Sequence, residues 1–219
     1  MASDKGFDEC IHSALRRAGA GEIATGTRER MDRYVEEVAL WSDRMHLIGR
    51  GRMRRNLELL ILDSLLLLKA AEESVLRREP GRAWRVADIG SGAGFPGIVW
   101  KILTPSIDVT LFERKMKPQL FLDRIISLLG LEGARVVGQD ASTFKGPGAF
   151  DLAASKAAGR LDIILPLAEK LLIPGGAYVT IKGRAWRDEL SEPGQGVMRL
   201  DSKRELPEKR GFALIFHKQ

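Results

Sequence analysis

Four glycines and one acidic residue stand at spacings that could build a binding site for a nucleoside. The glycines follow a short apolar run, at Gly90, Gly92, Gly94 and Gly97. Without side chains they let the backbone turn tightly between a strand and a helix and approach a ligand closely. Glu113 stands about 20 residues downstream, where an acid can accept hydrogen bonds from two ribose hydroxyls. The pattern predicts an adenosine-type cofactor at this loop.

The glycine spacing alone leaves two cofactors open. Residues 92–97 also satisfy the GxGxxG dinucleotide fingerprint, which is the pattern of a nicotinamide-dependent oxidoreductase. Asp88 favours S-adenosylmethionine, because a carboxylate at the end of the strand can pair with the cationic methionine portion but would repel a pyrophosphate. A glycine-rich turn without any ligand is the structural alternative. We therefore predict an S-adenosylmethionine-dependent methyltransferase.

The elements that must position these residues alternate between strand and helix patterns, which predicts an α/β fold with a largely parallel sheet. Strands are expected around Val86–Ile89 and at Ile107–Phe112, Ala134–Val137, Phe150–Ala154 and Ala177–Lys182. Helices are expected from the glycine loop to Leu103 and at Lys117–Leu129 and Leu161–Leu172. The tail, with Val197–Leu200 and Phe212–Phe216, suggests an antiparallel hairpin at the sheet edge. Pro193–Gly196 is expected to be a mobile loop.

The first third of the chain has helical rather than strand patterns. Apolar residues recur mostly at three- and four-residue spacings over Thr27–Ile48, which indicates an amphipathic helix, and a helical pattern resumes from Arg54 to about Leu76. We expect residues 1–80 to form a helical extension packed on the core and residues 81–219 to form a Rossmann-like domain. At 219 residues, no second domain of ordinary size is expected.

The chain is basic, with a net charge of +6, which fits a polyanionic partner such as nucleic acid. Five arginines crowd one segment whose nearby acids are Asp43 and Glu58: Arg44, Arg50, Arg52, Arg54 and Arg55. They could contact phosphates or form a solvated basic face. No membrane span or export signal stands out, so a cytoplasmic protein is expected. The single cysteine and three separated histidines predict no metal site.

Several motifs in the same order resemble the RsmG (GidB) family, bacterial enzymes that methylate N7 of a guanosine in 16S ribosomal RNA. The most specific are Asp88–Gly97, with its Phe-Pro-Gly ending, and Leu111–Lys117 followed by Phe121 and Leu122. Weaker similarities lie at Trp41–Ile48, Ile61–Leu65, Phe150–Ala157 and Ile181–Gly183. The Pro-Gly-Gly motif within Leu172–Tyr178 is common before the fifth strand of class I methyltransferases. The resemblance implies that fold, with S-adenosylmethionine as methyl donor and S-adenosylhomocysteine as product.

The resemblance also implies which residues form the site. Those expected to hold the cofactor are Asp88, Gly90, Ser91, Gly92, Gly94, Phe95, Glu113, Ala141, Ser142 and Lys156. Lys156 would lie near the methyl group and the target base, and Asp63 with Ser64 would brace the mouth of the site. Asp63 could instead be a helix cap or surface acid. Lys182, at the end of a strand, is a further catalytic candidate, although it could be a solvated lysine.

Some positions depart from the family pattern. Leu59 and Leu60 stand where an Arg-His pair is usual, and Asp140 and Lys156 replace customary arginines. Lysine keeps the charge of arginine but loses its planar two-pronged donor geometry. The implied partner is 16S ribosomal RNA or the small ribosomal subunit, bound by a monomer. The alternatives are a small-molecule or protein acceptor, or a noncatalytic RNA-binding module.

Overall fold

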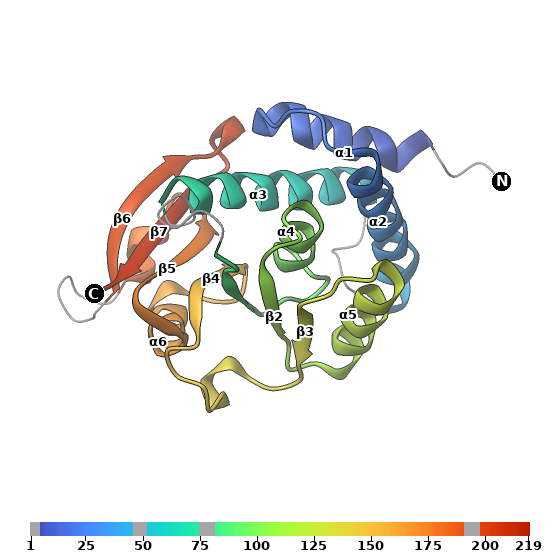
Figure 1. Cartoon of the computed structure of the whole chain (residues 1–219). Helices are drawn as coiled ribbons and strands as arrows, with labels where there is room; N and C mark the ends of the chain where they lie inside the picture. The colour runs from blue at the N-terminus through green and yellow to red at the C-terminus, as the bar shows by residue number, and fades with distance from the viewer. Residues whose placement is uncertain (1–4, 46–51, 75–81, 191–197) are drawn as a thin grey trace.

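A seven-stranded sheet forms the centre of the protein (Figure 1). The computed structural model describes residues 5–45, 52–74, 82–190 and 198–219. The strands follow the order β3-β2-β1-β4-β5-β7-β6. Their bounds are β1 Arg85–Ile89, β2 Asp108–Phe112, β3 Ala134–Val137, β4 Phe150–Lys156, β5 Leu172–Lys182, β6 Met198–Glu205 and β7 Phe212–Lys218. The first five pair in parallel, while β7 runs antiparallel to β5 and to β6. The predicted parallel sheet and terminal hairpin are confirmed.

Burial explains why the central strands read as short apolar runs. In β1 and β2 every residue after the first is buried, and in β4 the first six residues are buried. Side chains alternate between the two faces of a strand, so burial at successive residues requires cover on both faces. The strand order reverses between the neighbours β1 and β4, because the chain passes from β3 at one edge to β4 on the other side of β1. Ligands of open α/β sheets bind beside such a point, at the carboxyl ends of the strands.

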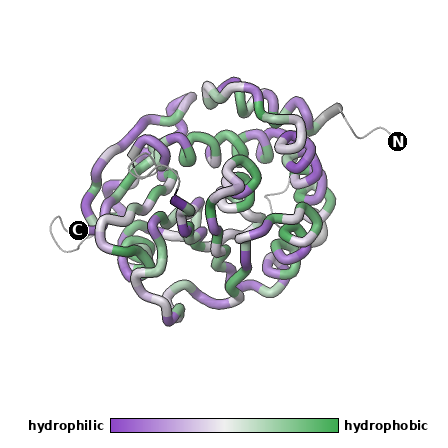
Figure 2. The backbone as a smooth tube through the Cα atoms, in the orientation of Figure 1, coloured by the Kyte–Doolittle hydropathy of each residue, from purple (hydrophilic) through white to green (hydrophobic). Residues whose placement is uncertain are grey.

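Most helices cover one face of the sheet. They are α1 Lys5–Ala18, α2 Thr25–Met45, α3 Met53–Ser74, α4 Gly97–Leu103 and α5 Met116–Leu129. Their apolar residues form one continuous core with that face, so the amino-terminal helices share the core of the sheet. The other face packs against α6 Leu161–Leu171 and the short turn containing Trp186. Figure 2 shows hydrophobic colour concentrated in the inner elements and hydrophilic colour gathered along the outer helices and β6.

The element bounds differ from the sequence expectations in several places. α1 was not predicted as a separate helix. β5 begins five residues earlier than expected, because Leu172 pairs with Phe150 of β4 before the register shifts across the Pro-Gly-Gly segment. α2 and α3 match the two predicted helical stretches. The expected mobile loop at Pro193–Gly196 and the expected boundary near residue 80 lie outside the described residues. Within the described ranges, no helix is long and apolar enough to cross a membrane.

Candidate active site

The glycine loop connects the end of β1 to the start of α4. The Gly90 and Ser91 amides both donate to the Phe112 carbonyl, at 2.9 and 3.0 Å, which fastens the loop to the end of β2. Gly94 has a φ of +98°, and a Cβ there would lie 2.5 Å from the Ile98 side chain. Only glycine fits this position without displacing α4. The loop is therefore held tightly against the sheet edge.

Asp88 lies beneath this loop, with no exposed surface. Its Oδ2 accepts from the Gly97 amide at 3.1 Å, whereas its Oδ1 has no partner among the described residues. Burial raises the pKa of Asp88 to about 7, although the Gly97 hydrogen bond opposes this. A Cβ on Gly97 would lie 2.7 Å from Oδ2. The carboxyl group thus supports the start of α4 from the inside of the fold.

Glu113 follows β2 and faces a cavity of about 880 Å³. Its Oε2 accepts from the Gly92 amide at 3.0 Å and its Oε1 from the Lys115 amide at 2.8 Å. The two hydrogen bonds fix the carboxylate against the glycine loop. A carboxylate has about four acceptor positions, so both oxygens can still accept from a ligand hydroxyl. The cavity is also lined by Gly90, Gly92 and Ala141.

The segment after β3 closes the far side of this larger cavity. The Asp140 carboxylate accepts from the Ser142 amide at 2.9 Å and caps a short 3₁₀ turn, Ala141–Thr143. Ala141 lines the cavity, whereas Ser142 does not; its carbonyl accepts from Lys170 Nζ at 2.5 Å. Asp140 therefore shapes the turn with its carboxylate, at a position where the family pattern has an arginine.

A second cavity, of about 440 Å³, adjoins the first and shares Gly90 and Gly92 with it. Three ionisable side chains from distant parts of the chain converge on it: Asp63 from α3, Lys156 at the end of β4, and Arg210 from the turn before β7. Arg210 Nη1 donates to Asp63 Oδ1 at 2.9 Å. Ser91 and Phe95 line it from the glycine loop.

Burial perturbs the charges in this smaller cavity. It raises the pKa of Asp63, an effect that the charges of Arg210 and Lys156 partly offset. It lowers the pKa of Lys156, against the opposing effect of Asp63. Asp63 is 5% exposed in the interior of α3, so it is neither a helix cap nor a surface acid. The smaller cavity therefore carries two cationic side chains and one carboxylate.

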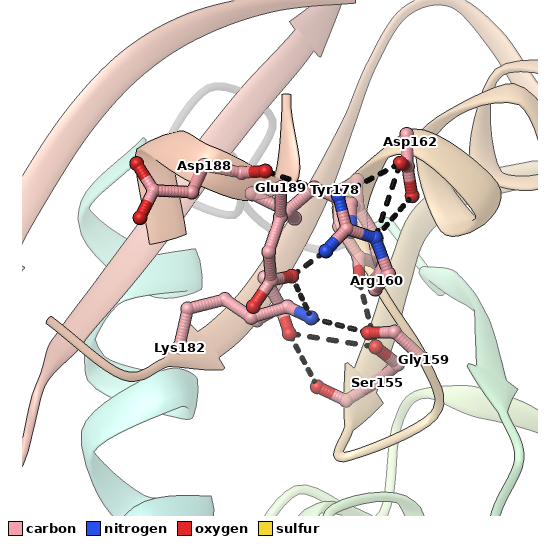
Figure 3. A network of polar contacts seen from close by, with 10 residues as sticks. Ser155, Gly159, Arg160, Asp162, Tyr178, Lys182, Asp188 and Glu189 are labelled. Atoms are coloured by element: carbon pink, nitrogen blue, oxygen red, sulfur yellow. Dashed lines mark hydrogen bonds and ion pairs between the residues drawn. The ribbon is translucent and has the colours of Figure 1, made fainter. Parts of the chain in front are cut away.

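Lys182 lines neither cavity. Its Nζ pairs with Glu189 Oε2 at 2.7 Å and donates to the Gly159 carbonyl (Figure 3). Glu189 Oε2 also accepts from the Leu161 amide, which ties the start of α6 to the same group. Lys182 is 9% exposed, so the solvated strand-end alternative is wrong. It fastens the segment between β4 and α6, where Ala158 and Gly159 line the larger cavity.

The five arginines between residues 44 and 55 are partly neutralised by acidic side chains. Arg55 pairs with Glu208 at 3.1 Å and with Glu58 at 3.6 Å. Glu208 also pairs with Arg17, from which it is separated by 191 positions, so the sequence gave no sign of this contact. Arg52 and Arg54 are exposed. The side chains of Arg44 and Arg50 lie outside the described part of the chain.

The predicted site residues thus separate into groups. The larger cavity takes Glu113 and Ala141, the smaller takes Ser91, Phe95, Lys156 and Asp63, and Gly90 and Gly92 line both. Asp88, Gly94, Ser142 and Lys182 line neither. Sequence reasoning missed Arg210, which no motif or spacing marked out.

Comparison with known proteins connects this geometry to a family. The family described as rRNA small subunit methyltransferase G matches residues 27–206. Proteins named Ribosomal RNA small subunit methyltransferase G include one from Desulfitobacterium hafniense, 31% identical over 83% of this chain and 74% of its own length. Another, from Arthrobacter sp., is 32% identical over 83% of this chain and 80% of its own. The match to a Sorangium cellulosum relative, 38% identical, covers 60% of this chain and 54% of that protein.

Solved structures share the fold at low sequence identity. A mutant of MtNAS in complex with S-adenosylmethionine has a TM-score of 0.59 and 16% identity, over 97% of this chain and 88% of that one. TrmN from Thermus thermophilus has a TM-score of 0.57 and 19% identity, over 86% of this chain and 53% of that one. The sheet order, the terminal hairpin and these similarities show the class I S-adenosylmethionine-dependent methyltransferase fold.

Proposed function

Because the chain belongs to the rRNA small subunit methyltransferase G family, we propose that it methylates N7 of a guanosine in 16S ribosomal RNA, with S-adenosylmethionine as the methyl donor. The observation that carries this proposal is the meeting of two cavities at Gly90 and Gly92. One cavity suits a nucleoside-containing donor, and the other, lined by cations, suits an acceptor nucleotide. A methyl group at their junction would be accessible to both ligands.

The residues of the larger cavity fit the donor. The Glu113 carboxylate is held by two backbone amides with acceptor positions to spare, as binding of two ribose hydroxyls requires. Gly90 lines both cavities, and a Cβ there would lie 3.1 Å from the Ala158 Cβ, so glycine lets the loop approach the segment after β4 closely. Ala141 would lie along the adenine. S-adenosylmethionine supplies a methyl group made electrophilic by the sulfonium charge.

Asp88 and Lys182 serve this donor site indirectly. The Asp88 carboxyl is buried, so we assign it to support of the loop and to a through-space attraction for the positive charge of the donor. Lys182 fastens Gly159 at the rim of the larger cavity. Gly94 and Ser142 shape the loop and the 3₁₀ turn. These four are positioning residues rather than ligand contacts.

Positioning is sufficient for the chemistry at guanine N7. That nitrogen carries a lone pair and no proton, so no general base has to act before it attacks the methyl carbon. Holding the reacting atoms about 3–3.5 Å apart and in line can contribute several kcal/mol. Phe95 and Leu60 give the smaller cavity an apolar wall beside its charges. An unpaired or flipped guanosine would fit this site better than one stacked in a helix.

The exposed arginines before and at the start of α3 fit the phosphates of the RNA. Replacing Arg52, Arg54 and Arg55 by alanine is expected to weaken RNA binding and to reduce its salt dependence by up to about 0.9 in log–log slope for each lost phosphate contact on duplex RNA, by analogy with B-DNA. S-adenosylmethionine binding should not change. Fluorescence anisotropy over a salt series measures the first effect, and equal RNA affinity at moderate salt would mark the cluster as a solvated face.

The decisive experiment is incubation of the protein with labelled S-adenosylmethionine and small ribosomal subunits that lack the modification. We expect label in 16S RNA at N7 of one guanosine, and none with the Glu113→Ala variant. The RNA should be mapped for the labelled base, and naked 16S RNA tested beside the assembled subunit. Label found instead in a small molecule or a protein fraction would identify that molecule, rather than RNA, as the acceptor. Failure to bind S-adenosylmethionine would leave only RNA binding.

A further inference from the structure

Arg210 has more hydrogen-bonding capacity than the protein uses. Its Nη1 is paired with Asp63, but its Nε and Nη2 are buried and have no partner among the described residues. The side chain is 20% exposed and lines the smaller cavity beside Lys156. Buried polar atoms in native proteins are normally satisfied, and an unpaired charged donor costs free energy. The Nε and Nη2 donors of Arg210 are therefore free to bind an additional acceptor.

The turn before β7 fixes where this side chain lies. Glu208 and Lys209 have φ values of +60° and +54°, and Leu206 N donates to the Gly211 carbonyl at 2.9 Å across the turn. A Cβ on Gly211 would clash with the Lys182 carbonyl, so the turn is pressed against the end of β5. Glu208 points to the arginines of α1 and α3. Arg210, two residues on, pairs with Asp63 at the cavity.

The charges of the smaller cavity favour an anion. Lys156 and Arg210 together carry two positive charges when protonated, against one negative charge on Asp63. Asp63 already occupies one edge of the guanidinium, which leaves the adjoining Nε and Nη2 edge. A guanidinium edge matches the oxygens of a phosphate, to which it can donate two parallel hydrogen bonds. The cavity also adjoins the loop that the donor is expected to occupy.

We propose that Arg210 is a substrate-binding residue whose Nε and Nη2 edge donates to the phosphate of the acceptor nucleotide, with Asp63 holding the guanidinium in place. This inference rests on the proposed function, because that function puts the acceptor nucleotide in the smaller cavity. It adds a phosphate contact to the site from residue 210, which lies beyond the family match at residues 27–206. Lys156 supplies a second positive charge to the same group.

The test uses the full chain with S-adenosylhomocysteine present, and guanosine 5′-monophosphate and guanosine as probes in NMR titrations. Arg210→Lys keeps the charge but loses the planar edge, and it retains a partner for Asp63. Arg210→Met removes the charge and the planar edge. The matched control is Arg184→Met, because Arg184 lies at the same end of the sheet, 60% exposed, and pairs with Glu205 outside the cavity. Cofactor binding and thermal melting show whether each variant is folded.

The parent chain should bind the monophosphate at least tenfold more tightly than guanosine. Arg210→Lys and Arg210→Met should lose most of that preference, and Arg184→Met should keep it. Equal binding of the two probes by the parent, no binding of the monophosphate, or an unchanged preference in a folded Arg210→Lys variant would overturn the proposal. If the preference depends on Arg210 but ribosomal RNA is not methylated, the proposed function fails and the phosphate site stands. If ribosomal RNA is methylated but the preference does not depend on Arg210, the proposed function stands and the phosphate site fails.

Discussion

The buried carboxyl group of Asp88 makes the stability of the protein depend on pH in an unusual direction. Its pKa rises from an ordinary value of 3.8 to about 7 in the fold, chiefly through burial. Each pKa unit is worth about 1.4 kcal/mol, so ionised Asp88 disfavours the folded state by roughly 4 kcal/mol. Between these pKa values the folded chain holds a proton that the unfolded chain has released. This contribution to stability is therefore present at low pH and is lost as the pH rises to about 7.

The substitution Asp88→Asn isolates this effect, because an amide oxygen can still accept from the Gly97 amide but the side chain cannot ionise. The free energy of unfolding is measured by urea denaturation at several pH values without cofactor. We expect the variant to gain stability relative to the parent as the pH rises, by up to roughly 4 kcal/mol between about pH 4 and about pH 8. Asp123→Asn, on the exposed face of α5, is the control and should show little such trend. A difference that changes by less than about 1 kcal/mol over the range refutes the reasoning.

Three further substitutions test the donor site. Gly97→Ala places a Cβ 2.6 Å from Leu111 and should lower stability by about 1–3 kcal/mol, whereas Gly21→Ala, with open space around it, should not; equal melting temperatures would contradict this. Glu113→Gln should weaken S-adenosylmethionine binding about tenfold or more in calorimetry, because it loses a charged acceptor. It should also lower the melting temperature, because its NH2 group cannot accept from one of the two backbone amides that Glu113 pairs with, and unchanged binding and melting would contradict this. Lys182→Met frees Glu189 and the rim of the larger cavity, so we expect a higher KM for S-adenosylmethionine and a lower Tm; if both are unchanged, Lys182 does not position the rim.

The fold could be predicted from the sequence wherever burial leaves a local pattern. β1, β2 and β4 are buried on both faces and appear as apolar runs, and α2 buries one face and appears with helical periodicity. The early start of β5 could not be predicted in this way. Its first residue, Leu172, pairs with Phe150 of β4, but the register then shifts across Pro174, Gly175 and Gly176, which disfavour strands.

The candidate site could likewise be predicted only where its residues are close together in the sequence. The glycine loop and Glu113 lie within one strand, helix and strand unit, so the spacing along the chain determines the geometry, and the Gly92 amide does contact Glu113. The smaller cavity depends instead on residues 63, 156 and 210, which only the complete sheet brings together. The family resemblance implies an arginine at position 156, where this chain has a lysine, so along the sequence a two-pronged donor is lost. The cavity nevertheless contains a guanidinium, from the turn before β7, and its free edge faces no competing partner among the described residues. The lysine at position 156 is therefore compatible with acceptor binding in the fold, because a planar donor reaches the cavity from Arg210.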